Sequence, residues 1–409
     1  MDKFLNIKSD GKVMVDKVFK AAVKAKEDAL IYGDQCIDAT LGTIFGEDSK
    51  FVAYNSVWEP FKDIDNIQKA KYAASIQGNP DYNAAIYKWL FESIDEKINC
   101  EIIATPGGAG AISSTLKNIL NPGEIAIKPN IGWGPYKTMA AEFDITLKDY
   151  NMFKDNKFDI QSYIDICNKV MDKQGKVLTI INDPCHNPTG YTLTEDEWDK
   201  VLNFTNELSE RGPVILLNDI AYVDYNMKGN EWKKHFKKFN NLNENVMVVI
   251  AFSTSKTLTA YGARAGAQVV ITKNKAQLND FKNAAIYSAR SIWSTVNNGA
   301  MKLFAKVTTD EVLLKNFMAE KQVYVDLLKE RSTIFLEEAS LVNLPIYPYK
   351  EGFFITVKIE DEDEKVRVYD ELQKLHIFTV QVDFGLRVAI CSVPKRKLVG
   401  LAKKINDLI

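Results

Sequence analysis

The chain has 409 residues, and 46% of them are hydrophobic, which is enough to form one large core and a smaller second one. Its 52 lysines and arginines nearly balance its 54 aspartates and glutamates, so the net charge of −2 gives no reason to expect nucleic acid or an anionic membrane surface as a partner. Five scattered cysteines without a C-x-x-C pair, three distant histidines, and the lack of a signal peptide or membrane-length apolar run favour a soluble, cytoplasmic protein without a metal site.

The amino-terminal region predicts a helix over residues 13–29, with lysines on one side. Its apolar side is expected to consist of Val15, Val18, Phe19, Ala22 and Val23. A short extended piece, residues 36–43, contains Gly42. The turn-forming run Gly78-Asn79-Pro80-Asp81 follows Tyr72 and precedes a helix that reaches Ile94.

A glycine-rich turn follows the next predicted strand, residues 101–105. Pro106-Gly107-Gly108-Ala109 opens a helix that runs to Leu120, which leaves free backbone N–H groups at a helix amino terminus and so makes a candidate anion site. Close packing of a turn is an equally open explanation. After a short strand at residues 124–129, Trp133 and Tyr136 are placed in a loop, where Trp133 either stacks on a planar ring or caps the core.

Three further apolar strands each end in polar residues. Residues 177–181 lead to Asn187, residues 214–217 lead to Asp219 and Tyr222, and residues 246–250 lead to Ser253, Ser255 and Lys256. Strand and helix patterns alternate here, which predicts a parallel sheet. Because ligands of open α/β sheets bind at the carboxyl ends of the strands, this edge is the candidate site.

Lys256 is the residue around which the other candidates are arranged. An amine at the end of a buried strand has a lowered pKa and becomes a nucleophile that forms Schiff bases with carbonyl compounds, pyridoxal phosphate included. Arg264, eight residues later, supplies a planar set of donors suited to a phosphate. The alternative is a surface loop with a solvated lysine and arginine.

Two further regions do not follow the alternating pattern of strands and helices. Residues 233–238 are interpreted as a solvated face with Trp232, Phe236 and Phe239 turned inward. Residues 300–341 predict one continuous helix that connects two domains, and an α+β region follows. Arg387, at the start of the last strand of that region, is either a clamp for a carboxylate or a guard on an edge strand.

As a set, Asn187-Pro188-Thr189-Gly190, Asp219-x-Ala221-Tyr222 and Ser253-x-Ser255-Lys256 with Arg264 resemble the class I pyridoxal phosphate-dependent aminotransferases of the aspartate and aromatic kind. The resemblance implies fold type I, an α/β fold with a mainly parallel seven-stranded sheet covered by helices and a smaller α+β domain. It further implies a homodimer whose active site is shared across the interface. The expected division is an amino-terminal segment and part of the small domain (1–50), the cofactor-binding domain (51–300), and the connecting helix with the carboxyl-terminal small domain (301–409).

The resemblance also implies roles for the residues. Lys256 would hold the cofactor as a Schiff base and move the substrate proton, Asp219 would pair with the pyridine nitrogen, and Tyr222 with Asn187 would donate to the phenolate oxygen. The implied phosphate-binding set is Gly107, Gly108, Ala109, Ser253, Ser255 and Arg264, with Tyr72 reaching the phosphate of the partner subunit. Trp133 would stack on the ring. The implied substrate contacts are Arg387 on the α-carboxylate, Gly42 beside it, Asn187, and Arg290 on a side-chain carboxylate across the dimer.

The function that follows from this resemblance is transamination by a ping-pong mechanism, from an L-amino acid (aspartate, glutamate or aromatic) to a 2-oxo acid. Arg290 has an alternative interpretation as an exposed helix arginine. Two other functions remain open at this point. One is a different reaction with the same cofactor, such as a β-elimination lyase or a decarboxylase; the other is a non-catalytic cofactor-binding regulator.

Overall fold

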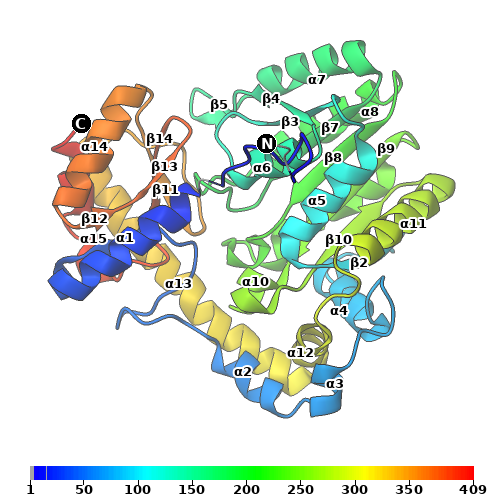
Figure 1. Cartoon of the computed structure of the whole chain (residues 1–409), viewed down its shortest axis with the longest axis horizontal. Coiled ribbons are helices and arrows are strands. Elements are labelled where there is room, and N and C mark those ends of the chain that lie inside the picture. The colour runs from blue at the N-terminus through cyan, green and yellow to red at the C-terminus, as the bar shows by residue number, and fades with distance from the viewer. Residues whose placement is uncertain (1–3, 15) are drawn as a thin grey trace.

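The structure is a computed structural model, and it describes residues 4–14 and 16–409. The chain forms two lobes, and the long helix α13 (Glu311–Leu341) runs between them (Figure 1). One lobe contains a large sheet with helices on both faces. The other contains the carboxyl terminus, a small sheet and helix α1 (Lys17–Tyr32), whereas the described segment before α1 lies against the large lobe near α6 (Pro135–Glu142).

The large sheet has seven strands, and all but one of them run in the same direction. Its order is β2 (Cys100–Thr105), β10 (Gly266–Ile271), β9 (Val246–Ser253), β8 (Val214–Asp219), β7 (Val177–Asn182), β3 (Ile125–Pro129) and β4 (Thr146–Tyr150). The exception is β10, which runs antiparallel to β2 and β9 on either side of it. Every residue of β7, β8 and β9 is buried, as the continuous apolar runs predicted for strands covered on both faces. The predicted mainly parallel sheet is confirmed.

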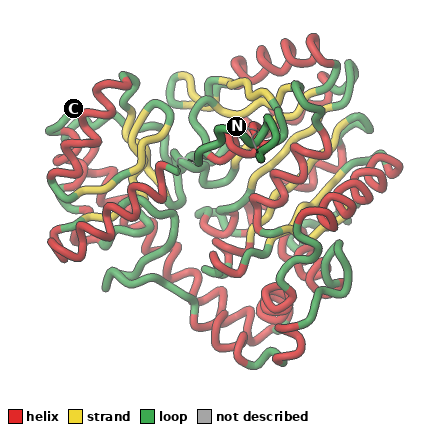
Figure 2. Tube along the Cα trace, in the orientation of Figure 1, coloured by secondary structure: helices red, strands yellow, loops and turns green. Residues whose placement is uncertain are grey.

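Helices cover both faces of this sheet (Figure 2). On one face, α5 (Gly107–Ile119), α6 (Pro135–Glu142) and α11 (Lys275–Ile292) form a core with residues such as Leu116 and Phe281. On the other face lie α4 (Pro80–Phe91), α7 (Ile160–Gln174), α8 (Glu195–Leu208) and α12 (Asn298–Thr309). The capping box of Thr194 and Glu197, expected from the sequence, is present at the start of α8.

The helical stretch near residue 310 differs from the prediction. Instead of one continuous helix over residues 300–341, α12 ends at Thr309 and α13 begins at Glu311. The side chain of Asp310 accepts hydrogen bonds from the backbone N–H groups of Val312 and Leu313, at 3.0 and 2.9 Å. Because this carboxylate satisfies free N–H groups, it starts a new helix where the apolar pattern alone suggested continuity.

The apolar side predicted for residues 13–29 is not the buried side of α1. Phe19 and Val23 are 67% and 56% exposed, whereas Ala21 and Ala25 are buried. Ala25 packs against Cys36 and Phe378 in a small core, so the side that approaches the rest of the lobe consists of small residues. Val15, which the prediction also placed on that face, lies outside the described residues.

The smaller lobe is built on an antiparallel sheet in the order β11 (Phe354–Lys358), β14 (Gly385–Ala389), β13 (Val380–Val382). Beside it, β1 (Ile37–Asp38) pairs in parallel with β12 (Ile377–Phe378). Helices α14 (Glu362–Lys374), α15 (Lys395–Leu398) and α16 (Leu401–Asn406) complete this lobe. Because Arg387 lies on the central strand of the sheet, the edge-guard interpretation of this arginine is wrong.

Residues 233–238 lie in a short helical segment of the large lobe. Trp232, Phe236 and Phe239 are buried as predicted, but Lys233 and His235 are buried as well. Lys233 Nζ donates to the carbonyl of Trp89 at 2.8 Å, so this stretch is not simply a solvated face. The other short elements are α2 (Asn55–Lys62), α3 (Asn66–Ala70), β5 (Phe153–Lys154), β6 (Lys157–Phe158), α9 (Asn230–Lys233) and α10 (Thr254–Thr257).

Candidate active site

Strands β7, β8 and β9 are neighbours in the large sheet and bring three predicted residues to one edge. Asn187 follows β7, Asp219 ends β8, and Lys256 lies in α10, directly after β9. The carboxyl ends of parallel strands meet at the same edge, which explains why residues far apart in the sequence gather here. The edge faces the smaller lobe, which supplies Arg387.

Lys256 is held inside the protein. Its Nζ donates to the carbonyl of Gly42 at 2.7 Å, and it lies 4.7 Å from the ring centroid of Tyr261 and 5.5 Å from that of Tyr222. Burial, with smaller contributions from the positive charges of Arg387 and Arg264, lowers the pKa of this amine to about 8. The surface-loop interpretation of Lys256 is therefore wrong.

Asp219 is a buried carboxylate with both oxygens engaged. Oδ2 accepts from the hydroxyl of Tyr136 at 2.6 Å, and Oδ1 accepts from the backbone N–H of Ala221 at 3.1 Å. Burial raises the pKa of Asp219, while these two hydrogen bonds act in the opposite direction. Tyr136 was assigned to a loop and given no role; it belongs to α6 and is a residue that sequence reasoning missed.

A chain of hydrogen bonds connects Tyr222 to the smaller lobe. Asn187 Nδ2 donates to the Tyr222 hydroxyl at 3.3 Å, and Asn187 Oδ1 accepts from Arg387 Nη1 at 3.2 Å. Asn182, at the end of β7, fixes the position of Asn187 by accepting its backbone N–H at 2.7 Å. Because the Tyr222 oxygen accepts the hydrogen bond from Asn187, the proton of the Tyr222 hydroxyl stays available for donation to another acceptor.

The glycine-rich turn and Arg264 form a cradle. Gly107 has φ +74°, and a Cβ placed there would lie 2.8 Å from Arg264 Nη2, so a larger residue would collide with the guanidinium. Arg264 Nη1 donates to Ser255 Oγ at 3.3 Å, and Ser253 Oγ accepts from the Ser255 backbone N–H at 3.3 Å.

Gly108 and Ala109 lie in the first turn of α5, beside this cradle. A Cβ on Gly108 would lie 3.4 Å from the Ser253 Cβ, so the turn passes close to the end of β9. Free N–H groups of a helix amino terminus, two hydroxyls and one arginine are the donors that a phosphate requires. The structure thus brings together all six residues that were predicted as the phosphate-binding set.

Arg387 is buried and only partly satisfied. Nη2 donates to the carbonyl of Thr40 at 2.6 Å, and the guanidinium carbon lies 4.2 Å from the ring centroid of Phe354. In the described part of the chain, its Nε has no hydrogen-bond partner. A buried donor left in this state favours a bound carboxylate. Gly42 lies against the same Phe354, since a Cβ on Gly42 would be 2.6 Å from its Cζ.

The remaining predicted residues fall into two groups. Trp133 lies just before α6, partly buried, with its ring centroid 5.4 Å from that of Tyr136 and therefore near Asp219. Tyr72 is 82% exposed, and Arg290 is an exposed residue of α11 that donates to Ser294 Oγ at 2.6 Å. The single chain does not bring Tyr72 or Arg290 to the site.

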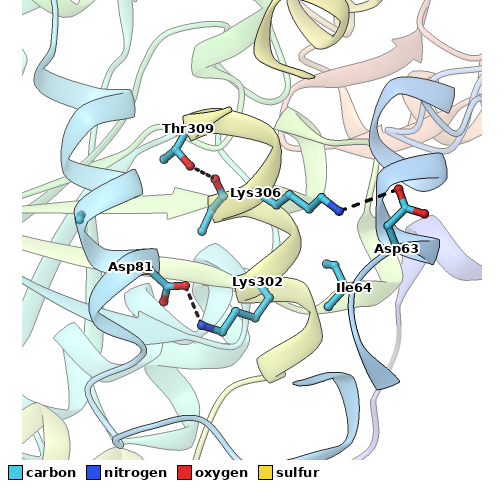
Figure 3. Close-up of a pocket in the computed structure, with 8 residues that line it drawn as sticks. Asp63, Ile64, Asp81, Lys302, Lys306 and Thr309 are labelled. Carbon is cyan, nitrogen blue, oxygen red and sulfur yellow. Dashed lines mark hydrogen bonds and ion pairs between the residues drawn. The ribbon is translucent and has the colours of Figure 1, made fainter. Parts of the chain in front are cut away.

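A separate cavity of 490 Å³ lies between α4, α12 and the segment that follows α2, which contributes Asp63 and Ile64. Lys302 and Asp81 form an ion pair in its wall at 2.7 Å, and Lys306 approaches Asp63 at 3.9 Å (Figure 3). Of the described residues, none that the sequence analysis assigned to the site lines this cavity. The candidate site is therefore the edge of the large sheet and not this cavity.

Two features of the described residues bear on other kinds of function. Across residues 4–14 and 16–409, no helix is both long enough and apolar enough to cross a membrane. In the same part of the chain, no group of three or more histidine, cysteine, aspartate or glutamate residues is placed to hold a metal ion.

Comparison with known proteins is consistent with this geometry. An aminotransferase from Anaerococcus prevotii has a structure that is 31% identical to this chain, with a TM-score of 0.95 over 99% of both chains. An aromatic-amino-acid aminotransferase from Burkholderia pseudomallei, in a structure covalently bound to pyridoxal phosphate, is 20% identical, with a TM-score of 0.78 over 99% of this chain and 100% of that one.

Among curated proteins, the aromatic-amino-acid aminotransferase of Pseudomonas aeruginosa is 27% identical over 214 residues, which cover 51% of this chain and 51% of that protein. The chain thus spans about half the length of this curated relative. The sequence model described as aminotransferase class I and II matches residues 42–405, which include every predicted site residue. The chain belongs to the family of class I and II aminotransferases.

Proposed function

We propose that this chain is a pyridoxal phosphate-dependent aminotransferase, which moves the amino group of an L-amino acid to a 2-oxo acid. The observation that carries the proposal is the enclosed amine of Lys256, with a pKa of about 8, in the helical turn α10 that follows β9, the strand next to β8 and Asp219. At pH 7 about a tenth of such an amine is neutral, compared with less than about one part in a thousand of an ordinary lysine. Family membership supports the same activity.

The residues present fit the cofactor. The cradle of Gly107, Gly108, Ser253, Ser255 and Arg264 suits its phosphate. Lys256 would bind its aldehyde carbon, and Asp219 would face its ring nitrogen. Tyr222 and Asn187 would donate to its phenolate oxygen, and Trp133 would cover one face of the ring. When bound, the cofactor supplies an electron-withdrawing ring that stabilises negative charge at the substrate α-carbon.

The chain's own groups then have separate tasks. Arg387 would bind the substrate α-carboxylate through Nε, the donor that has no partner in the described chain, and through the guanidinium edge next to it. Lys256 Nζ, once free, would take the proton from the substrate α-carbon, hold it, and deliver it to the former aldehyde carbon of the cofactor. Asp219 would keep a negative charge beside the ring nitrogen, held in place by Tyr136 and Ala221.

We further propose that the site is completed by a second copy of the chain. Tyr72 and Arg290 lie exposed in the single chain, and so do Ile67, Tyr287 and Ile292, at 70%, 81% and 56%. Exposed apolar residues on α3 and α11 are the kind of surface that an interface covers. In a homodimer, Tyr72 would reach the phosphate of the neighbouring site, and Arg290 would select substrates with a second carboxylate, aspartate or glutamate.

The reaction is tested with the purified chain loaded with pyridoxal phosphate. Aspartate, glutamate and phenylalanine are each offered as the amino donor, with oxaloacetate as the acceptor for glutamate and 2-oxoglutarate for the other two. The proposal predicts one new amino acid for each oxo acid formed, without ammonia. Cysteine, which carries a leaving group on its β-carbon, is offered separately; its conversion to pyruvate, ammonia and sulfide would instead indicate a lyase, and release of carbon dioxide from any donor would indicate a decarboxylase. Absence of turnover with every donor would favour the alternative function, a non-catalytic cofactor-binding regulator.

The shared site is tested by complementation. Lys256→Ala and Arg290→Ala are expected to be nearly inactive with aspartate when each is assayed alone. After mixing and exchange of subunits, a mixed dimer contains one site with an intact Lys256 and the partner's intact Arg290, so activity with aspartate should return. Lys275→Ala, which changes an exposed cation at the other end of α11, is the control and should keep activity by itself. If mixing restores nothing, Arg290 does not act across an interface.

The cellular location also belongs to the proposal. All five cysteines are free, and four of them are buried. Unpaired cysteines are typical of proteins in a reducing compartment. We therefore propose a cytoplasmic location, and fractionation of cells that express the tagged chain would test it.

A further inference from the structure

Tyr136 is connected to the candidate site at two points. Its hydroxyl donates to Asp219 Oδ2 at 2.6 Å, and its ring makes an edge contact with Trp133 at 5.4 Å between centroids. The side chain is fully buried, at 0% exposure, so water does not compete for the hydroxyl. One residue of α6 thus supports both the carboxylate and the indole assigned to the cofactor ring.

The direction of the hydrogen bond fixes its chemical effect. Ala221 N–H donates to Oδ1 of Asp219 and the Tyr136 hydroxyl donates to Oδ2, so both oxygens act as acceptors, which is the pattern of an ionised carboxylate. Each oxygen keeps a further lone pair for a third donor. The hydrogen bond from the Tyr136 hydroxyl reduces the negative charge available on the carboxylate. Asp219 is therefore a weaker base than an equally buried carboxylate that lacks this hydrogen bond.

We propose that Tyr136 is a positioning residue that keeps the proton between Asp219 and the cofactor on the ring nitrogen. This inference rests on the proposed function, in which Asp219 faces that nitrogen. Because a weaker carboxylate base competes less well for the shared proton, the ring stays cationic. A carboxylate without the tyrosine would draw the proton toward itself and leave a neutral ring, which stabilises negative charge less well.

A purely structural role is the alternative. Tyr136 fills space between α6 and the sheet, and removal of its hydroxyl would then affect stability without changing the state of the ring nitrogen. Tyr163 provides a matched control, because it is equally buried in the same lobe and its hydroxyl shares a hydrogen bond with Thr179 Oγ1 at 3.1 Å. Loss of that hydroxyl should cost a similar amount of stability and leave the site unchanged.

The experiment uses Tyr136→Phe, Tyr163→Phe, Asp219→Asn and the double variant Tyr136→Phe/Asp219→Asn. Each is loaded with pyridoxal phosphate labelled with ¹⁵N in the ring, and the NMR resonance of that nitrogen reports whether it carries a proton. In Tyr136→Phe the resonance should move toward the unprotonated position, and kcat should fall about tenfold, as for loss of a hydrogen bond to a charged group. Tyr163→Phe should keep the resonance of the unmodified protein.

The double variant separates the two proposals. In the Asp219→Asn background, the added Tyr136→Phe change should not move the resonance further, because its effect passes through the carboxylate. An unshifted resonance in Tyr136→Phe, together with a shifted one in Asp219→Asn, would overturn the role of Tyr136 alone. If Asp219→Asn itself leaves the resonance in place, the assignment of Asp219 to the ring nitrogen fails.

A second variant keeps the shape and the donor of Tyr136. Incorporation of 3-fluorotyrosine at this position provides a more acidic hydroxyl, which should strengthen the hydrogen bond to Asp219 and move the resonance in the direction opposite to that in Tyr136→Phe. Movement in the same direction as in Tyr136→Phe, or no movement, would contradict the proposal. This variant also covers the case in which Tyr136→Phe fails to fold.

Discussion

The enclosed amine of Lys256 should destabilise the folded chain when no cofactor is bound. Its pKa falls from 10.5 to about 8 because the folded protein disfavours the charge. At about 1.4 kcal/mol per pKa unit, this shift corresponds to a cost of about 3 kcal/mol when the amine is protonated. Replacement by methionine removes that cost and also removes the hydrogen bond from Nζ to Gly42, which contributes about 1 kcal/mol. Lys256→Met should therefore stabilise the cofactor-free chain by about 2 kcal/mol at pH 7.

The pH dependence of this gain has a definite sign. Below pH 8 both the folded and the unfolded chain carry the proton, so the full cost is present. As the pH rises from 8 toward 10.5, the folded chain releases the proton while the unfolded chain keeps it, and the cost disappears. Urea unfolding of the cofactor-free protein and of Lys256→Met, at pH 7 and at pH 10, measures the effect.

An exposed lysine serves as the control for this measurement. Lys169→Met, on α7, should change the free energy of unfolding by less than about 0.5 kcal/mol at either pH. A Lys256→Met variant that is less stable than the parent at pH 7, or that gains equally at both pH values, would refute the reasoning that burial sets the pKa of this amine.

Three other changes test separate parts of the structure. Asp219→Asn should fold and bind cofactor but lose about a hundredfold or more in kcat, measured at matched cofactor content, because the fixed charge beside the ring is gone. Gly107→Ala should weaken cofactor binding about tenfold in equilibrium dialysis, because its Cβ would lie 2.8 Å from Arg264 Nη2 at a backbone φ of +74°. Asp310→Ala should cost about 1 kcal/mol in urea unfolding and leave kcat unchanged, because it removes only the cap of α13.

The edge of the large sheet could be predicted because its information is local. Each strand that delivers a site residue is a continuous apolar run followed at once by polar residues, and burial on both faces produces that pattern. Asn187, Asp219 and Lys256 could therefore be placed together without any knowledge of long-range contacts. The glycine-rich turn before α5 could be predicted for the same reason, since the strand, the turn and the helix are consecutive.

Contacts between distant segments could not be predicted in this way. Tyr136 binds Asp219 across a separation of 83 residues, and a tyrosine three positions after Trp133 carries no local signal of that partner. The inward face of α1 was also misjudged, because close approach to Cys36 and Phe378 selects alanine at Ala25 and leaves the larger apolar residues outside. Hydrophobicity predicts that a helix has an apolar side, but the neighbouring surface decides which residues fit against it.

The positive charges of the site connect binding to reactivity. Burial has the largest effect on the pKa of Lys256, and Arg387 and Arg264 lower it further through repulsion. The anions assigned to these arginines, a substrate carboxylate and a cofactor phosphate, would neutralise that repulsion. Before the substrate binds, the charge of Arg387 would keep a larger fraction of the amine neutral, and once both anions are bound the amine would become a better proton acceptor. In the proposed function, the two arginines that anchor the ligands would therefore also adjust the basicity of Lys256 between its task as nucleophile and its task as base.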